Sequence, residues 1–115
     1  MNANKIIVLV PFYNASNYIN ACYQSLISQE YENYEIYFID DCSSDNSLDL
    51  ISDKFPKVIK RRNSVRLFAL ESIYNVLISR EFNDEDIIVF VDGDDYLINN
   101  QLSKNLNTIY IYRNC

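Results

Sequence analysis

The sequence predicts an α/β protein with a mostly parallel β-sheet flanked by helices. Short apolar runs rich in β-branched residues alternate with segments whose apolar residues recur at helical spacing, and this alternation continues along the chain. A helix between two strands carries the chain back across the sheet, so successive strands pair in parallel. The chain has 115 residues, of which 49% are hydrophobic, and residues 1–115 are therefore expected to form a single domain with one small core.

The first strand and the first helix are expected near the start of the chain. Lys5–Val10 is a continuous apolar run that predicts a buried strand. Ser16–Ser28 then shows apolar residues at helical spacing. Either Asn14 or Ser16 is available as the N-cap, because a side-chain oxygen at that position accepts a hydrogen bond from the first turn.

A second strand and helix follow, and then a short third strand. Glu35–Asp40 is apolar on both faces, as a strand inside a parallel sheet should be. Ser43–Ser52 opens with Ser44 and Asp45, which can cap a helix, and continues with apolar residues at helical spacing. Val58–Ile59 is expected to form a short strand at the edge of the sheet.

The second half of the chain repeats the pattern. We expect a helix at Leu67–Arg80, a buried strand at Asp86–Val91 and a last helix at Asn100–Tyr110, capped by Asn99 or Asn100. The helix at Leu67–Arg80 is expected to bury one apolar face against the sheet. That face would consist of Leu70, Ile73, Tyr74 and Leu77.

The counts of histidine, glycine and cysteine exclude several kinds of catalytic, metal and phosphate-binding site. The chain has no histidine, so a Ser-His-Asp triad, a Cys-His pair or a His-ligated zinc site cannot be formed from it. Its one glycine, Gly93, is too few for a dinucleotide fingerprint or a Walker P-loop. The three cysteines are odd in number and form no Cys-x-x-Cys pair, so reduced thiols are expected.

The acidic balance of the chain limits its partners. A net charge of −6 makes nucleic acid an unexpected partner, and it would repel an anionic ligand unless a cation lay between the two. No window reaches the roughly 18 apolar residues of a membrane span. The apolar start is too short for a signal peptide. We therefore expect no nucleic-acid partner, no transmembrane segment and a cytoplasmic location.

Polar residues gather directly after three of the expected strands. The first strand runs into Pro11-Phe12-Tyr13-Asn14, the second into Asp40-Asp41-Cys42-Ser43-Ser44-Asp45, and the strand at Asp86–Val91 into Asp92-Gly93-Asp94-Asp95. Ligands of open α/β sheets bind beyond the carboxyl ends of the strands. Because the strands are expected to be parallel, these three segments should lie along one edge of the sheet and form a ligand site.

The acidic segment Asp92–Asp95 predicts a site for a divalent cation. Carboxylates two residues apart in an extended chain point to the same side, and Gly93 between them lets a ligand approach the backbone. Clustered carboxylates need a counter-cation, and oxygen ligands suit Mn²⁺ or Mg²⁺. Such an ion would bridge the acidic protein to a diphosphate and neutralise its charge. The alternative is an acidic turn without a ligand.

Asp41 has two interpretations at this stage. Together with Ser43 and Ser44 it can cap the helix expected after the second strand. An acidic residue after a second strand is equally well placed to hydrogen-bond the base or ribose of a nucleotide. The residues alone leave both interpretations open.

Five segments resemble those of the family 2 glycosyltransferases, which have the GT-A fold. Ile7–Asn14 resembles the family's first strand and its Pro-x-Tyr-Asn turn, and Tyr18–Gln29 resembles its first helix, which ends Ser-Leu-x-x-Gln. Ile39–Ser47 is similar to its Asp-Asp-x-Ser-x-Asp-x-Ser/Thr segment. Ala69–Tyr74 resembles its middle helix, and Phe90–Asp95 its Asp-x-Asp-Asp metal motif. The segments follow the family's order and cover nearly the whole chain.

The resemblance implies a Rossmann-like GT-A nucleotide-binding half that binds a nucleoside diphosphate sugar through Mn²⁺ or Mg²⁺. The nucleobase and ribose would contact Pro11, Tyr13 and Asp41. Asp92 would lie near the ribose or the donor sugar. The enzyme would then transfer the sugar from the nucleoside diphosphate to an acceptor hydroxyl.

The resemblance also indicates the metal ligands, and the chain differs from the family at the start of the middle helix. Asp94, with Asp95, would reach the metal that bridges the diphosphate, and Asp94 would thereby contact the nucleotide sugar as well. The family's middle helix opens with a glycine, whereas this chain has Ser64–Phe68 there, without a glycine.

The second half of a family member is not recognisable in this chain. Members continue past the metal motif into an acceptor site and a carboxylate general base, whereas this chain ends at Cys115 and contains no residue that can be named as the base. A domain truncated at its C-terminus is therefore expected, which could associate with itself or with a chain that completes the fold. The acceptor, whether glycan, protein or lipid, is not predicted.

Two further classes of function remain open. One is a non-catalytic, truncated nucleotide-binding module without turnover. The other is a phosphotransfer domain of the haloacid dehalogenase or receiver type, which would also use an acidic cluster. The haloacid dehalogenase motif requires Thr or Val where Tyr96 stands, and both types carry acidic residues on or after the first strand, where this chain has Pro11-Phe12.

Overall fold

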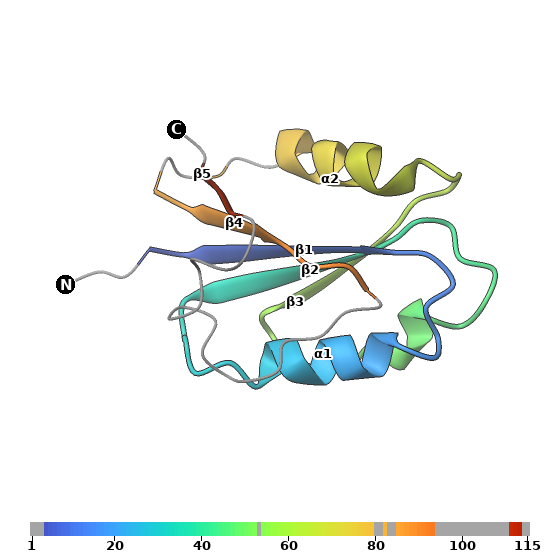
Figure 1. Ribbon diagram of the computed structural model, residues 1–115, viewed down its shortest axis with the longest axis horizontal. Coiled ribbons are helices and arrows are strands. Elements are labelled where there is room, and N and C mark those ends of the chain that lie inside the picture. The colour runs from blue at the N-terminus through green and yellow to red at the C-terminus, as the bar shows by residue number, and fades with distance from the viewer. Residues whose placement is uncertain (1–3, 53, 80–81, 83–84, 94–110, 114–115) are drawn as a thin grey trace.

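The computed structural model of the chain contains one five-stranded sheet in the order β3-β2-β1-β4-β5 (Figure 1). The structure describes residues 4–52, 54–79, 82, 85–93 and 111–113. The strands are β1 (Ile6–Phe12), β2 (Tyr34–Asp40), β3 (Val58–Arg62), β4 (Ile87–Phe90) and β5 (Ile111–Arg113). The helices are α1 (Ile19–Ile27), α2 (Phe68–Ser79) and a single 3₁₀ turn, η1 (Leu48–Leu50).

The mostly parallel sheet predicted from the sequence is confirmed. β1 lies at the centre and pairs in parallel with β2 on one side and with β4 on the other. β3 pairs in parallel with β2 and forms the edge expected at Val58–Ile59. β5 pairs antiparallel with β4. The helix predicted at Asn100–Tyr110 lies outside the described residues.

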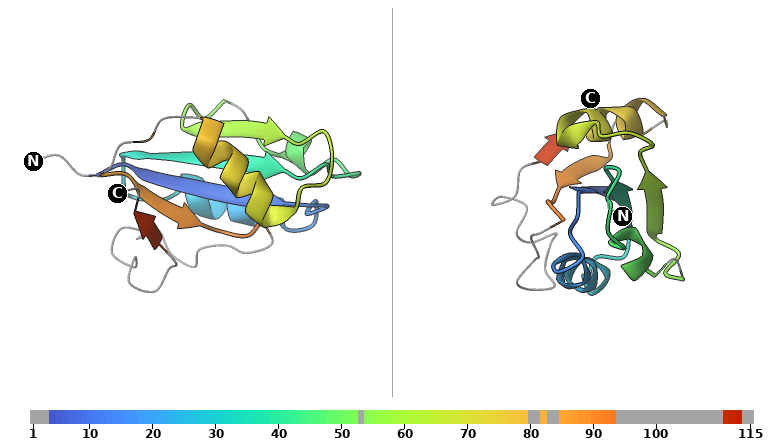
Figure 2. Two further views of the ribbon diagram at one scale, coloured as in Figure 1. Left: turned by 90° about the horizontal axis from the view of Figure 1, so that it is seen from above. Right: turned by 90° about the vertical axis from the view of Figure 1, so that its right-hand side faces the viewer.

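The sheet separates two cores because alternate side chains of each strand point to opposite faces. α1 and η1 cover one face and α2 covers the other (Figures 1 and 2). On the α1 side, Val8 and Val10 of β1 and Phe38 of β2 are buried with α1 residues such as Ile19 and Leu26. The smaller core on the α2 side contains Ile7, Leu9, Tyr37, Ile39, Val76 and Ile88.

The helix predicted at Ser43–Ser52 is wrong, since this segment is a loop that ends in η1. Its polar side chains bond across the molecule instead of capping a helix. Backbone N–H groups of residues 14–16 donate to them at 2.9, 2.8 and 3.2 Å. The accepting oxygens belong to Ser43, Ser47 and Asp45, respectively. Short polar side chains that bond to the backbone compete with helix formation, and here they link two loops.

The predicted N-cap of α1 is also wrong. α1 begins at Ile19 and its N-cap residue is Tyr18, whose side chain makes no capping hydrogen bond. The side-chain oxygen of Asn14 accepts the Ser44 N–H at 2.8 Å, so it is used between the loops. Asn14 also has a φ of 49°, a left-handed conformation that Asn tolerates better than most residues.

The predicted buried face of α2 is wrong in part. Ile73 and Leu77 pack against the core, but Leu70 and Tyr74 are 84% and 58% exposed. The helix turns Ser72 and Val76 to the sheet instead, and the Ser72 hydroxyl accepts a hydrogen bond of 2.7 Å from the Asn63 side chain. Apolar residues occur around most of α2, so their spacing did not define its rotation.

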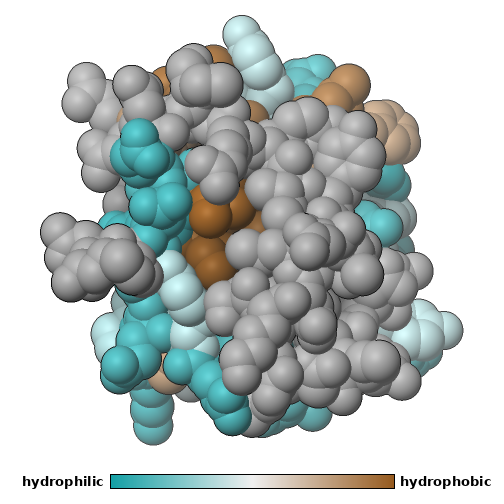
Figure 3. Space-filling model, turned by 60° about the vertical axis from the view of Figure 1, so that its left-hand side comes forward, coloured by the Kyte–Doolittle hydropathy of each residue, from teal (hydrophilic) through white to brown (hydrophobic). Residues whose placement is uncertain are grey.

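The described surface is polar on the face that Figure 3 shows. Hydrophobic surface of the described residues is visible there mainly at a small central area and at the upper edge, the side on which α2 lies (Figure 3). Among the described residues, no helix is long and apolar enough to cross a membrane.

Candidate functional site

The described parts of the three polar segments meet at one edge of the sheet. The Asp41 N–H donates to the Phe12 carbonyl at 2.9 Å, so the segment after β2 lies against the end of β1. On the other side of β1, the Gly93 N–H donates to the Pro11 carbonyl at 3.2 Å. The parallel ladder therefore continues past the strands and brings the residues after β2 and β4 to the end of β1.

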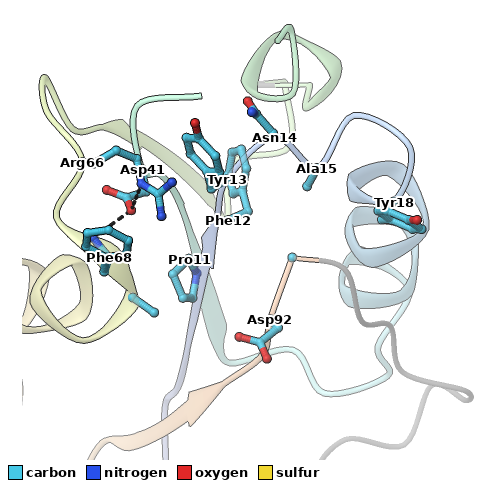
Figure 4. Close-up of a pocket in the computed structure, with 12 residues that line it drawn as sticks. Pro11, Phe12, Tyr13, Asn14, Ala15, Tyr18, Asp41, Arg66, Phe68 and Asp92 are labelled. Atoms are coloured by element: carbon cyan, nitrogen blue, oxygen red, sulfur yellow. Dashed lines mark hydrogen bonds and ion pairs between the residues drawn. The ribbon is translucent and has the colours of Figure 1, made fainter. Parts of the chain in front are cut away.

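A pocket of about 420 Å³ opens at this edge (Figure 4). It is lined by Pro11, Phe12, Tyr13, Asn14, Ala15, Tyr18, Asp41, Arg66, Phe68, Ala69, Asp92 and Gly93. The structure thus brings four residues of the predicted site to one pocket: Pro11, Tyr13, Asp41 and Asp92. The predicted metal ligands Asp94 and Asp95 lie outside the described residues.

Asp41 forms one wall of the pocket and is only 3% exposed. Its Oδ1 accepts hydrogen bonds from the Leu67 N–H at 2.7 Å and from the Asn63 side chain at 3.1 Å. Its Oδ2 accepts from the Phe68 N–H at 2.8 Å and from Arg66 Nε at 2.9 Å. Asp41 therefore does not cap the helix predicted after β2; it ties the turn before α2 to the end of β2.

These four hydrogen bonds stabilise the ionised form of Asp41. Burial by itself would raise the pKa of this carboxyl. The hydrogen bonds from the Leu67 N–H, Asn63, the Phe68 N–H and Arg66 outweigh burial, and the pKa of Asp41 lies below its ordinary value. The carboxylate is thus a fixed negative charge at neutral pH.

Arg66 is a residue of this wall that the sequence did not identify. Its guanidinium carbon lies 3.5 Å from the centre of the Tyr13 ring and 4.3 Å from that of the Phe68 ring. The side chain is 36% exposed and is held by its ion pair with Asp41 (Figure 4). An arginine just before a predicted helix was the available signal, but the contacts with Tyr13 and Asp41 exist only in the folded chain.

Phe68 begins α2 in a left-handed conformation, with a φ of 67°. Glycine adopts this conformation without penalty, whereas other L-residues are strained in it. The family that the sequence resembles opens its middle helix with a glycine, whereas this chain has no glycine in Ser64–Phe68. The hydrogen bond from the Phe68 N–H to Asp41 and the contact of its ring with Arg66 offset the strain.

Asp40 lies beside Asp41 in the sequence but does not line the pocket. It is fully buried, and its carboxylate forms an ion pair of 2.6 Å with Arg62. It also accepts the Ser43 N–H at 2.9 Å. Asp40 therefore holds the start of the loop after β2, while its neighbour faces the pocket.

Asp45 connects that loop to the turn that carries Tyr13. Its carboxylate accepts hydrogen bonds from the Ser16 N–H and from the N–H and hydroxyl of Ser47. Burial favours the neutral acid, but these bonds prevail and lower the pKa of Asp45. The turn at Tyr13 is therefore positioned from the loop after β2.

The opposite side of the pocket is formed by Asp92 and Gly93, after β4. A Cβ atom on Gly93 would lie 2.4 Å from Cβ of Phe12 and 3.3 Å from Cδ1 of Ile19. We expected Gly93 to admit a ligand. The structure shows that its missing side chain also admits β1 and α1, so packing alone requires a glycine here.

The predicted metal ligands Asp94 and Asp95 follow Asp92 and Gly93 in the sequence and lie outside the described residues. No group of three or more His, Cys, Asp or Glu able to hold a metal occurs among the described residues. Asp92 contributes one carboxylate to the pocket, and the sequence continues with Asp94 and Asp95. A few carboxylate oxygens without histidine fit Mn²⁺ or Mg²⁺, which share their coordination with water and phosphate.

Comparison with known proteins identifies relatives of this chain. A family model described as "Glycosyl transferase family 2" matches residues 7–113. An uncharacterized glycosyltransferase of Haemophilus influenzae is 34% identical over 111 residues, which cover 93% of this chain and 43% of that protein. A poly(ribitol-phosphate) beta-glucosyltransferase of Bacillus spizizenii is 34% identical over 98 residues, which cover 81% of this chain and 15% of that protein.

Solved structures show the same fold. The crystal structure of TarS from S. aureus matches with a TM-score of 0.73 and 28% identity, over 90% of this chain and 19% of that one. TarS has also been crystallised with UDP and with UDP-GlcNAc, and these structures match with a TM-score of 0.72. The chain thus spans less than half the length of the curated relatives and structures described here.

Proposed function

Since this chain belongs to glycosyl transferase family 2, we propose that it binds a nucleoside diphosphate sugar in the pocket beyond β1, β2 and β4. The observation that carries this proposal is the convergence of Tyr13, Asp41 and Asp92 on one open pocket at the carboxyl edge of a parallel sheet. Its volume of about 420 Å³ lies within the range of small-molecule sites. The complexes of TarS with UDP and UDP-GlcNAc support the same class of ligand.

The nucleoside would occupy the side of the pocket formed by Pro11, Tyr13 and Asp41. Pro11 and the ring of Tyr13 supply apolar surface for a base, and the Tyr13 side chain is available to a ligand because the residue is 43% exposed. Asp41 supplies a negative charge buried behind this surface. Apolar surface with a few fixed polar groups is the usual composition of a site that orients a small ligand.

The diphosphate would lie toward the other side of the pocket, where Asp92 leads into Asp94 and Asp95. In this proposal Asp92 lies near the ribose or donor sugar, and Asp94, with Asp95, holds Mn²⁺ or Mg²⁺. The ion would neutralise charge on the leaving diphosphate. An anionic ligand needs such a cation here because the protein carries a net charge of −6.

The reaction proposed for the whole protein is transfer of the donor sugar to an acceptor hydroxyl. The new bond joins the acceptor oxygen to the sugar, and the bond between the sugar and the diphosphate breaks. The general base and the acceptor site would come from the region that the longer relatives contain beyond this stretch. The cytoplasmic location and any self-association stay predictions from the sequence.

Isothermal titration calorimetry with UDP-, GDP- and dTDP-sugars, each with and without Mn²⁺, tests the proposal. We expect binding of at least one donor that strengthens when Mn²⁺ is present. The variant Asp94→Asn should lose this metal dependence, whereas Asp49→Asn, which removes an exposed carboxylate away from the pocket, should keep it. Absence of metal-dependent heat with every donor would contradict the proposal.

The two alternative functions predict different results. A phosphotransfer domain should be labelled by acetyl phosphate or beryllofluoride, and we expect no labelling. A non-catalytic module should bind the donor but release no nucleoside diphosphate when acceptors are added. Donor hydrolysis or sugar transfer by the protein would identify an enzyme and exclude a non-catalytic module.

A further inference from the structure

We propose that α2 pairs in antiparallel orientation with α2 of a second copy of this chain, and that Leu70, Tyr74 and Ile78 form the centre of this contact. These three residues are called the apolar row below. The inference goes beyond the proposed function, because it concerns the side of α2 that faces away from the sheet and from the pocket.

The first observation is that the outer side of α2 is apolar. Leu70, Tyr74 and Ile78 recur at every fourth residue and therefore lie along one side of the helix. They are 84%, 58% and 63% exposed, whereas Ser72 and Val76 are buried against the sheet. No described segment lies over α2 when the molecule is seen from above (Figure 2). A helix that is hydrophobic on all sides is normally buried in a larger structure, so we expect the apolar row to be covered.

Exposed apolar side chains are also concentrated at this helix. Among the described residues, eight large hydrophobic side chains are exposed, and five of them lie within Val65–Ile78. Contiguous exposed apolar surface is typical of a site that contacts another molecule. The region of α2 is therefore the part of the described surface most suited to an interface.

The second observation points to a second copy as the partner, since opposite charges stand at the two ends of the apolar row. Glu71 is exposed in the first turn of α2. At the other end, the exposed Arg61 donates from Nη1 to the Ser79 hydroxyl at 2.8 Å. Glu71 and Ser79 flank the apolar row on the same side, about 12 Å apart along the helix. Within the described part of the chain, neither Glu71 nor Arg61 forms an ion pair.

These features make the surface complementary to itself. A two-fold contact places the same patch of each copy against the other, so one end of the patch must complement the opposite end. When two antiparallel α2 helices meet at Tyr74, Leu70 of each copy faces Ile78 of the other. Glu71 of each copy then lies beside the end of the other helix, where Arg61 is held. A parallel pair would instead bring like charges together, which is unfavourable.

The size of the contact predicts a weak dimer. α2 has 12 residues and is therefore about 18 Å long. A contact along one side of such a helix is smaller than the roughly 800 Å² per partner of a standard interface. We therefore expect a reversible dimer that forms at micromolar or higher concentrations.

Pairing through the apolar row leaves the pocket open. Phe68 and Ala69 are the residues of α2 that line the pocket. Neither belongs to the row of every fourth residue that contains Leu70, so both point to other sides of the helix. Donor binding should therefore not depend on pairing.

Sedimentation velocity measurements on this chain over a series of concentrations test the inference. We expect an equilibrium between monomer and dimer. Leu70→Glu places a carboxylate in the apolar row and should raise the dissociation constant of the dimer about tenfold or more. The matched control is Leu50→Glu, at an exposed leucine of η1 on the opposite face of the sheet, which should leave the dissociation constant unchanged. Thermal unfolding shows whether both variants fold.

A charge reversal tests the antiparallel orientation. Glu71→Arg or Arg61→Glu alone would place like charges opposite each other and should weaken the dimer about threefold or more. The double variant restores opposite charges and should return the dissociation constant close to that of the parent. A parallel pair would not give this recovery, because residue 71 of each copy would then face residue 71 of the other.

Three results would overturn the inference. The chain could stay monomeric at every concentration, which would leave the apolar row to another occupant, such as the region that the longer relatives contain. Leu70→Glu could weaken the dimer no more than Leu50→Glu does, which would place the contact elsewhere. The double charge reversal could fail to restore the dimer, which would exclude the antiparallel pair.

Calorimetry with the donor sugars and Mn²⁺ separates this inference from the proposed function. Leu70→Glu should bind the donor as the parent does. Failure of the parent and of Leu70→Glu alike to bind any donor would contradict the proposed function, whereas the sedimentation results would still decide the pairing of α2.

Discussion

The two sides of the pocket are held in place by different physical means. On the Asp41 side, four hydrogen bonds converge on one buried carboxylate and hold the residues before α2. On the Asp92 side, the Gly93 N–H donates to the Pro11 carbonyl, the Cys22 thiol donates to the Asp92 carbonyl, and Gly93 packs closely against Phe12. The Asp41 side depends on hydrogen bonds to a buried carboxylate, whereas the Asp92 side depends on close packing that only a glycine permits.

This difference suggests a division of tasks. A side that recognises a base benefits from rigid, pre-organised groups, because fewer side chains lose freedom on binding. A side that receives a cation and a diphosphate needs carboxylates whose charge the ligand itself compensates. Four predictions test this contrast.

Removing the Asp41 carboxylate should have the largest effect on folding. Asp41→Ala leaves the charge of Arg66 without its partner and two backbone N–H groups without acceptors, which should lower the free energy of unfolding by about 3 kcal/mol. Urea denaturation measures it. The control is Asp49→Ala at an exposed site, expected within about 0.5 kcal/mol of the parent. Equal losses in the two variants would mean that the Asp41 side is not held by its hydrogen bonds.

A methyl group on Gly93 should be the next most costly change. Gly93→Ala places Cβ 2.4 Å from Cβ of Phe12, which is fixed to the backbone of β1, and should destabilise the protein by about 2 kcal/mol. Adding Ile19→Val removes Cδ1 of Ile19, which lies 3.3 Å from the added Cβ. It should restore little, since the contact with Phe12 remains. Full recovery in the double variant would show that Ile19, not β1, limits the space at Gly93.

The stability that the Asp41 carboxylate contributes should depend on pH. The folded pKa of Asp41 is lowered, so the unfolded chain binds more protons between the folded and unfolded pKa values, and stability rises with pH in that window. The contribution is complete above an unfolded pKa of about 3.9 and is lost as pH falls through the folded pKa. The Asp41→Asn variant lacks this contribution to stability. The urea midpoints of the parent and the variant should therefore differ most above about pH 5 and converge in acid. A difference in urea midpoint that stays constant at every pH would contradict a lowered pKa of Asp41 in the folded protein.

The smallest effect is expected at Phe68. Its φ of 67° suits glycine, so Phe68→Gly should be more stable than Phe68→Ala by about 1 kcal/mol, although both variants lose the ring over Arg66. Thermal unfolding of the pair isolates the backbone term. If alanine is as stable as glycine, the start of α2 must leave the left-handed conformation when the ring is removed.

The strands and the edge that carries the site were predictable from local pattern. A run such as Lys5–Val10 is apolar on both faces because both faces of β1 are covered, and this is visible residue by residue. Parallel pairing then requires that the residues after β1, β2 and β4 meet at one edge. The positions of Pro11, Tyr13, Asp41 and Asp92 around one pocket follow from that rule.

The errors share one cause, which is competition from contacts distant in the sequence. The helix predicted at Ser43–Ser52 is lost because Ser43, Asp45 and Ser47 bond to residues about 30 positions earlier. The rotation of α2 buries Ser72, whose hydroxyl accepts a hydrogen bond from the side chain of Asn63, a residue outside the helix. Local spacing contains no information on such bonds.

Four parallel strands and the acidic, histidine-free composition of the segments after them could be predicted from the sequence, because these features depend on periodicity and composition. The role of each polar group at that edge depends on the contacts of the folded chain. Asp41 and Arg66 are 25 residues apart, and the hydrogen bond between them forms only when the chain folds. A carboxylate is a ligand contact or a structural acceptor according to how many donors the folded chain brings to it, and that number is set by three-dimensional packing.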